Sequence, residues 1–516
     1  MLRTTAKYTI GPTPADRGPR PDRAGQALSL ISALLNSLHR QGVPYCYWKS
    51  AARLPAVLAG EADLDLIAER TVQHLIMRVL AESGFKPFPS VASRGHPAVI
   101  SFLGHDEAAG RIVHVHLHLA VLTGERLLRN YVLPWAPAFI ARAVPVPALY
   151  GVRVLDPADE AVLLAVRACV ELRRWDPITL RDWRISQDKF ARDQQTLAAK
   201  VERAQFCNRA VELVGEEAAY LLAADVYAAQ WRGLSGRTRR RVRQALAEYR
   251  TYNGPEARAR AAWRGLHWLA GGLNKRHLHW PRPWSRLAPG GGCVVALMGV
   301  DGSGKSTVVA ALRAWLGAEV DVMPIYFGTG DGRPSLLLLP FKLMVPLFTR
   351  LLRQKPRGSS HGMVSDRAPG LVFSVLLAGW ATVLAVEKRS KLRAAHRGAR
   401  RGMVVIADRY PQDEIADYND GPLLPRLAHV PAWLRRVESR SYALARRLPP
   451  DLVIKLEAPP ETLALREPSM DRRVIQDRVN ALQRLRFPGA RVVRVDATQP
   501  LDDVLRAVKA AIWSML

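Results

Sequence analysis

The sequence predicts an α/β protein, in which a doubly wound parallel sheet follows an α+β domain that carries a helical extension. Three observations support this prediction. Short apolar strands alternate with helical patterns from residue 293 onward, helix and strand patterns are mixed over 25–155, and helical patterns alone dominate 156–270. Strands separated by helices favour parallel pairing within one sheet, whereas short mixed elements favour an α+β arrangement.

Length and charge limit the classes of protein to which the chain can belong. Its 516 residues are too many for one ordinary domain, and 48% apolar with 23% charged residues excludes wholesale disorder. The formal net charge of +29 favours polyanionic partners such as nucleotides, nucleic acid or an anionic membrane surface, without choosing among them. The four cysteines form no CxxC pair, which argues against a disulfide scaffold or a structural zinc site. We therefore expect a reducing, cytoplasmic location.

Composition divides the chain into five segments. Residues 1–24 are basic, contain several prolines and lack the apolar core of a signal peptide, so they are predicted to be a disordered tail. The other segments are a mixed domain at 25–155, a helical extension at 156–270, a linker rich in Gly, Pro, Arg and Trp at 271–292, and a C-terminal domain at 293–516.

The mixed domain begins with a helix and continues with short strands. Apolar residues at helical spacing predict a helix over 26–41 that ends at Gly42, and a second helix over 72–83 that ends at Gly84. Strands are predicted at 43–48, 64–68 and 112–119.

The helical extension contains a basic run, Arg237 to Arg243. No pattern of aromatic residues for base stacking accompanies this run, so we interpret it as a solvated helix face and expect no sequence-specific nucleic-acid partner.

A phosphate-binding loop opens the C-terminal domain. The apolar strand 293–298 leads directly into a GVDGSGKST loop, and a helix is predicted from Val308 onward. Glycines allow successive backbone N–H groups to point at phosphate oxygens, and the helix N-terminus adds positive potential. The candidate nucleotide-binding residues are Gly299, Asp301, Gly302, Ser303, Gly304, Lys305, Ser306 and Thr307. Lys305 is expected to reach the β- and γ-phosphates, and the Ser306 hydroxyl to ligate Mg²⁺.

Further strands of this domain end in polar residues. Strand 403–407 ends in Asp408-Arg409-Tyr410, strand 452–456 precedes a helix and an arginine-rich stretch, and strand 491–495 ends in Asp496-Ala497. A last helix is predicted over 501–513.

On these residues the domain resembles the thymidylate kinase family of nucleoside monophosphate kinases. The resemblance rests on GVDGSGKST, on ADRY after a strand, on PDLVIKLEAPPE and on RVVRVDATQPLDDV. It implies that Arg409 holds the phosphate of the acceptor and that Asp408 lies near the metal. It also implies lid arginines that clamp the transferred group, for which the candidates are Arg466, Arg472 and Arg473. The Asp496-Ala497 turn would border the base of ATP.

The segment between the phosphate-binding loop and Asp408 does not identify the phosphate acceptor. This segment is long and unusually apolar, notably at 335–352 and 370–386. Within it, Arg333 is either a contact for the acceptor phosphate or a solvated turn residue. A nucleoside monophosphate such as dTMP is the first expectation, and a related phosphate acceptor is the alternative.

A pair of carboxylates marks the mixed domain. Asp63 and Asp65 alternate along a strand and therefore share a face, where they could hold Mg²⁺ for nucleotidyl transfer. The preceding WKS and the D-L-D pattern resemble the nucleotidyltransferase fold, although no third carboxylate is evident. A solvated pair at the edge of the sheet is the alternative.

On the strand where the third carboxylate would be expected, the sequence has three histidines. His114, His116 and His118 share one face of a predicted strand. Three interpretations are open: metal or phosphate ligands beside the two aspartates, half-buried structural residues, or partners of the acidic pair in a site without catalysis.

Membrane contact is expected to be peripheral at most. The uncharged stretch 370–386 is shorter than the roughly 20 residues that a spanning helix needs, and we interpret it as a buried helix. The Trp-, Arg- and Lys-rich stretch 263–284 would suit an anionic lipid surface.

Together these features predict a kinase that uses ATP and Mg²⁺ to phosphorylate a small-molecule phosphate acceptor. The alternative is a regulatory nucleotide-binding module that controls the nucleotidyltransferase-like domain. The sequence leaves the oligomeric state undetermined.

Overall fold

The computed structural model describes residues 27–125, 127–171, 183–228, 233–328, 371–415, 421–422, 424 and 430–516. Of residues 183–189, 371–377 and 380 it describes the backbone only. The predicted tail at 1–24, the apolar stretch at 335–352 and Arg333 lie outside the described residues. The chain divides into two compact units, Met1–Ala270 and Gly271–Leu516.

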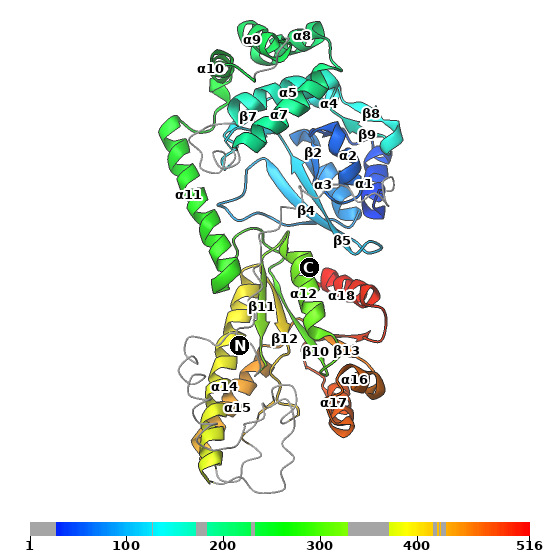
Figure 1. Ribbon diagram of the computed structural model, residues 1–516, viewed down its shortest axis with the longest axis vertical. Helices are drawn as coiled ribbons and strands as arrows, with labels where there is room; N and C mark the ends of the chain where they lie inside the picture. The colour runs from blue at the N-terminus through cyan, green and yellow to red at the C-terminus, as the bar shows by residue number, and fades with distance from the viewer. Residues whose placement is uncertain are drawn as a thin grey trace, which may run out of the picture. The chain divides into compact units, whose positions relative to one another are not determined.

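The first unit is built on a seven-stranded mixed sheet with the strand order β3-β4-β5-β2-β1-β9-β8. Figure 1 labels β2, β4, β5, β8 and β9 of this sheet. Its strands are β1 (Cys46–Tyr47), β2 (Leu64–Ile67), β3 (Lys86–Pro87), β4 (Val99–Asp106), β5 (Arg111–His118), β8 (Val144–Val146) and β9 (Val152–Val154). Strand β2 runs parallel to β5, and β1 runs parallel to β9, whereas the other neighbouring strands are antiparallel. Two short strands, β6 (Val121–Thr123) and β7 (Tyr131–Leu133), form a separate hairpin.

Two hydrophobic cores lie on opposite faces of this sheet. Leu64 and Leu66 of β2 belong to a core that also contains buried residues of α1 (Ser29–Arg40) and α3 (Gln73–Glu82). Ile67 of the same strand belongs to a second core, in which α5 (Pro157–Val170) is the main element. Because side chains alternate along a strand, Asp65 lies on the α5 face of the sheet.

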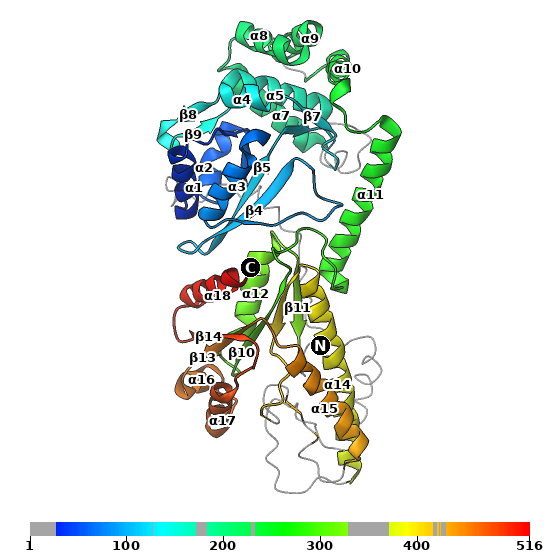
Figure 2. The same cartoon turned by 180° about the vertical axis from the view of Figure 1, so that it is seen from behind.

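The first unit also contains further helices, which Figure 2 labels in the view from behind. They are α2 (Leu54–Leu58), α4 (Ala136–Ala141), α7 (Trp183–Ala198), α8 (Arg203–Val214), α9 (Glu216–Val226), α10 (Gly236–Ala245) and α11 (Gly254–Leu273). The basic run 237–243 lies in α10, which is capped at its N-terminus by the Ser235 hydroxyl.

The long strand β4 is absent from the sequence-based prediction. It pairs with β5 along its whole length, although Ser101, Gly104 and Asp106 interrupt its apolar pattern. Asp106 is buried because it caps another element: its Oδ2 accepts hydrogen bonds from Ser29 Oγ at 2.8 Å and from Leu30 N at 3.0 Å, at the start of α1. A cap supplied from so far along the chain leaves no local sequence signal.

The second unit contains a five-stranded, entirely parallel sheet with the order β11-β12-β10-β13-β14. Its strands are β10 (Cys293–Gly299), β11 (Val322–Tyr326), β12 (Val404–Asp408), β13 (Leu452–Glu457) and β14 (Arg491–Asp496). The helices are α12 (Lys305–Gly317), α14 (Leu371–Arg400), α15 (Ala432–Arg447), α16 (Pro460–Arg466), α17 (Arg472–Arg484) and α18 (Leu501–Met515). This parallel sheet with interleaved helices confirms the predicted α/β class.

The segment predicted as a linker is largely structured. Helix α11 extends to Leu273, and the carboxylate of Asp321 accepts hydrogen bonds from the backbone N–H groups of Trp284, at 2.7 Å, and Ser285, at 2.6 Å. Ala288 N donates to Gly402 O at 2.9 Å. Residues 284–288 are therefore part of the second unit.

Of the apolar stretch at 370–386, the described residues from Leu371 onward form the start of helix α14, which continues through its basic part to Arg400. Within the described parts of the chain, none of the helices has both the length and the apolar character required to cross a membrane.

Candidate functional site

The phosphate-binding loop lies at the carboxyl end of the central strand β10. This strand passes through Gly299 into the loop, and α12 begins at Lys305. Gly302 and Gly304 have φ angles of 80° and 85°, which side chains disfavour. A Cβ at Gly299 would contact Ser303 Oγ and lie 3.2 Å from Leu456 O, so this position also requires glycine. The motif therefore has the strand, loop and helix geometry that phosphate binding needs.

Lys305 is buried at the base of the loop. Its ammonium donates a hydrogen bond to Val300 O at 2.8 Å and lies 3.7 Å from Asp301 Oδ1. Burial lowers its pKa to about 8, against the opposing effect of the Asp301 charge. Ser306 and Thr307 are exposed in the first turn of α12.

Asp301 links the loop to two arginines. Its Oδ1 accepts a hydrogen bond from Arg409 Nη2 at 2.9 Å, and its Oδ2 accepts one from Arg478 Nη1 at 2.6 Å. Burial would raise the pKa of this carboxyl group, but the charges of Lys305, Arg409 and Arg478 outweigh burial and hold the pKa below its usual value. Asp301 is therefore ionised at neutral pH and holds both guanidinium groups beside the loop.

Asp408 and Arg409 reach this region from the neighbouring strand. Asp408 ends β12 and pairs in register with Leu297 of β10. Arg409 follows with a φ of 68°, a left-handed conformation that is uncommon for residues other than glycine. This conformation turns the chain immediately after the strand, at the sheet edge where parallel α/β folds bind ligands.

Of the predicted lid arginines, only Arg466 lies against the loop. The Cβ of Arg466 would be 3.5 Å from a Cβ added at Gly302, and Arg466 Nη1 donates to Ala497 O at 3.0 Å. Arg472 and Arg473 are exposed in the first turn of α17. The Asp496-Ala497 turn thus adjoins Arg466, and the exposed Asp496 carboxylate accepts a hydrogen bond from Thr498 N at 2.8 Å.

Arg478 is the residue of this site that the sequence interpretation missed. It follows Ile475 by three residues and directly precedes Val479, both of which α17 buries. Arg478 therefore lies at the edge of the apolar stripe of α17. A residue in this position points along the surface of the domain, and this pattern in the sequence could have identified Arg478 as a site residue.

A buried lysine fastens α17 to the sheet. Lys455 lies in β13 and is 1% exposed, and its Nζ donates to Leu482 O at 2.8 Å and to Leu485 O at 2.6 Å. The last carbonyls of a helix lack partners within the helix and carry partial negative charge, so an ammonium satisfies them well. The position of Arg478 therefore depends on the attachment of α17 to β13.

The first unit contains a second polar cluster, between β2 and β5. Asp65 pairs in register with His116, and the Nδ1 of His116 lies 3.3 Å from Asp65 Oδ1. His118 Nε2 lies 3.2 Å from the same oxygen, and burial lowers the pKa of His118 to about 4, so that its neutral ring donates this hydrogen bond. The structure thus brings the predicted aspartates and histidines together.

Lys49 completes the surroundings of Asp65. Its ammonium lies 3.9 Å from the ring centroid of Trp48, and burial lowers its pKa to about 8 against the opposing charge of Asp65. Burial would raise the pKa of Asp65, but Lys49 and hydrogen bonds from His116 and His118 keep the pKa well below its usual value.

Comparison with known proteins identifies distant relatives. No family model matches the chain. The Escherichia coli (strain K12) ATP-binding protein YghS is 29% identical over 227 residues, which are 43% of this chain and 93% of YghS. The ATP-binding protein YghR of the same strain is 27% identical over 234 residues, which are 45% of this chain and 89% of YghR. A solved deoxyadenosine kinase from M. mycoides with bound dATP covers 42% of this chain and 97% of its own, with 13% identity and a TM-score of 0.24.

Proposed function

We propose that the second unit is an ATP-dependent phosphotransferase that moves the γ-phosphoryl group of ATP to a nucleoside monophosphate, with dTMP as the first candidate, or to a related phosphate acceptor. The observation that carries this proposal is the convergence of Lys305, Arg409 and Arg478 on Asp301 at the phosphate-binding loop. Three cations around a loop of this geometry suit a phosphoryl group under transfer. The ATP-binding relatives add support.

The residues at the loop suit both ATP and Mg²⁺. Gly304 has open space where a side chain would stand, and the positive φ angles of Gly302 and Gly304 give the loop the tight turn in which backbone N–H groups can face phosphate oxygens. The Ser306 hydroxyl and the Asp408 carboxylate are oxygen ligands, which Mg²⁺ prefers. When bound, Mg²⁺ would neutralise charge on the β- and γ-phosphates.

Each side chain has a distinct role in the proposed reaction. An oxygen of the acceptor phosphate attacks the γ-phosphorus while the bond to the β–γ bridging oxygen breaks and ADP leaves. Lys305 stabilises the charge that develops on the transferred group, and Arg409 orients the phosphate of the acceptor. Arg466 and Arg478 approach from the side of α16 and α17, and the Asp496-Ala497 turn borders the base.

An acceptor panel tests this proposal. The purified full chain is incubated with ATP, Mg²⁺ and each of the nucleoside monophosphates, sugars and sugar phosphates, and ADP is measured. We expect ADP to form only with an added acceptor, and the acceptor to gain one phosphoryl group. ATP binding without ADP formation for any acceptor would contradict the kinase and favour a regulatory nucleotide-binding module.

Proton uptake gives a second test of the loop. Because the pKa of Lys305 is about 8 without ligand, a large share of its side chains are neutral at pH 8.5. Bound polyphosphate favours the charged form and raises this pKa, so ATP binding at pH 8.5 should take up protons. Calorimetry in EDTA, with buffers of different ionisation enthalpy, measures this uptake.

The matched control for proton uptake is Lys305→Arg. A guanidinium stays protonated throughout this pH range, so the variant should bind ATP without the uptake. Equal uptake in the parent and in Lys305→Arg would exclude Lys305 as its source.

A further inference from the structure

A second ligand-binding site is carried by the polar face of β2 and β5 in the first unit. Strand β5 alternates buried Val113, Val115 and Leu117, which face the core beside α1, with His114, His116 and His118 on the opposite face. The parallel register that places Asp65 opposite His116 also brings Asp63, just before β2, beside His114. Two carboxylates and three imidazoles therefore share one surface of the sheet.

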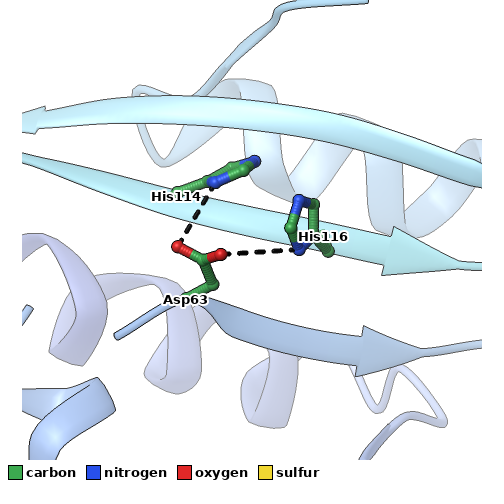
Figure 3. Close-up of side chains that lie close together, drawn as sticks. All are labelled: Asp63, His114 and His116. Carbon is green, nitrogen blue, oxygen red and sulfur yellow. Dashed lines mark ion pairs between the residues drawn. The ribbon is translucent and has the colours of Figure 1, made fainter. Parts of the chain in front are cut away.

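Asp63 lies between two of these histidines. Its Oδ1 is 3.3 Å from His114 Nδ1, and its Oδ2 is 3.9 Å from His116 Nδ1 (Figure 3). Both imidazoles present their Nδ1 atoms to the carboxylate, and one ligand atom from each of the three residues lies within 4.8 Å of the other two. Ligands of a tetrahedral ion with bonds of about 2.0–2.1 Å are separated by about 3.3 Å. The distance between His114 and Asp63 has this value, and His116 would have to move closer to Asp63 when an ion binds.

Charge distinguishes Asp63 from Asp65. Asp65 interacts with the ammonium of Lys49 and accepts a hydrogen bond from the buried His118. It also lies 3.3 Å from His116 Nδ1, so an ion bound at Asp63 would share His116 with Asp65 or draw this imidazole away from it. These groups already compensate its negative charge, and the lysine would repel an incoming cation. The charged or titratable neighbours with the largest effect on Asp63 are His114, His116 and Asp65, two imidazoles and a second carboxylate.

We propose that Asp63, His114 and His116 bind a divalent first-row transition metal of the Zn²⁺ type. Imidazole nitrogens with one carboxylate oxygen are the ligand set of such ions, whereas Mg²⁺ prefers oxygen ligands alone. The site is therefore distinct in metal preference from a two-carboxylate Mg²⁺ site of nucleotidyl transfer.

The proposed site is open on one side. The Asp63 side chain is 46% exposed and that of His116 is 17% exposed, whereas His114 lies in the interior at 4%. Three protein ligands leave at least one coordination position of a tetrahedral ion for water or for an oxygen of a small molecule. Because Asp63 is exposed, the open coordination position would be accessible from solvent. Catalytic zinc sites have such an open position, whereas structural zinc sites do not.

Metal titration of the full chain without nucleotide tests the proposal. Co²⁺ is used as an optical probe and Zn²⁺ in competition, with X-ray absorption to identify imidazole ligands. We expect one equivalent of Co²⁺ to bind with a d–d spectrum of nitrogen and oxygen ligation, Zn²⁺ to displace it, and Mg²⁺ in excess not to do so. The X-ray absorption data should show two imidazole ligands on the bound ion.

Variants locate the ion. Loss of a residue that only hydrogen-bonds to a metal ligand costs about 10–100-fold in metal affinity. Asp63→Asn/His116→Gln removes two direct ligands and should therefore cost more than about 100-fold. His74→Gln, an exposed histidine on α3, is the matched control and should retain full affinity. Thermal unfolding of each variant verifies that the fold is kept, and Asp63→Asn alone provides a change confined to an exposed side chain.

Two results would overturn the proposal. One is the absence of saturable Co²⁺ and Zn²⁺ binding by the folded parent protein. The other is equal affinity in the parent and in Asp63→Asn/His116→Gln, because the ion would then bind elsewhere on the chain.

Discussion

Replacing Lys305 with alanine is expected to lower acceptor-dependent ADP formation by at least about 10²–10³-fold, the loss that follows removal of one group that stabilises transition-state charge. The ammonium is positioned for this role, because it is buried at the base of the loop within hydrogen-bonding distance of Val300 O. Turnover is measured at saturating ATP and acceptor, and circular dichroism verifies the fold.

The control for this variant is Lys509→Ala, which removes a lysine that lies over the ring of Trp315 in the same unit. It should keep the parent turnover. If folded Lys305→Ala turned over at the parent rate, the assignment of the phosphate-binding loop as the site of phosphoryl transfer would be wrong.

Replacing Arg409 with alanine should raise the KM of the acceptor by about 10- to 100-fold and leave ATP affinity nearly unchanged. A hydrogen bond to a charged group contributes about 1.5–3 kcal/mol, which corresponds to this range. Asp301 should remain ionised and compensated in the variant, because it retains Arg478 at 2.6 Å and Lys305 at 3.7 Å although one positive charge is lost. Calorimetry gives the ATP affinity, and initial rates give the KM of the acceptor.

Asp301→Asn separates a direct role of Arg409 from an indirect one. This variant keeps the guanidinium but removes the charge that holds it. If Arg409 acted only by positioning Asp301, then Arg409→Ala and Asp301→Asn would raise the KM of the acceptor equally. A comparable loss of ATP and acceptor affinity in Arg409→Ala would contradict the assignment of this residue to the acceptor.

The sequence predicted the parts of the site that are contiguous in the chain. The phosphate-binding loop is one such part, because nine consecutive residues contain the strand end, the glycines and the first turn of the helix. The Asp-Arg pair after β12 is another, since a polar pair after a buried strand marks the ligand-binding edge of a parallel sheet.

Features formed by residues distant in sequence were not predicted. Arg478 reaches Asp301 because buried side chains of α17 and the hydrogen bonds from Lys455 attach this helix to the core of the unit, and nothing near Arg478 in the sequence indicates that lysine. The proximity of the histidines to the aspartates was among the interpretations left open, but the specific pairing of Asp63 with His114 depends on the parallel register of β2 and β5, which the sequence does not reveal.

The attachment of α17 through Lys455 has a consequence for motion. Separating the C-terminal end of this helix from β13 would leave a buried ammonium without its carbonyl partners, so we expect this end to stay fixed during turnover. A rigid helix with one fixed end moves most at the other. With a rise of about 1.5 Å per residue, Arg472 is about 18 Å from Arg484 and Arg478 is about 9 Å from it, so any rotation displaces Arg472 about twice as far. Arg478 would then move about half as far as Arg472 and stay nearer the loop, whereas the exposed Arg472 and Arg473 would make the larger excursion.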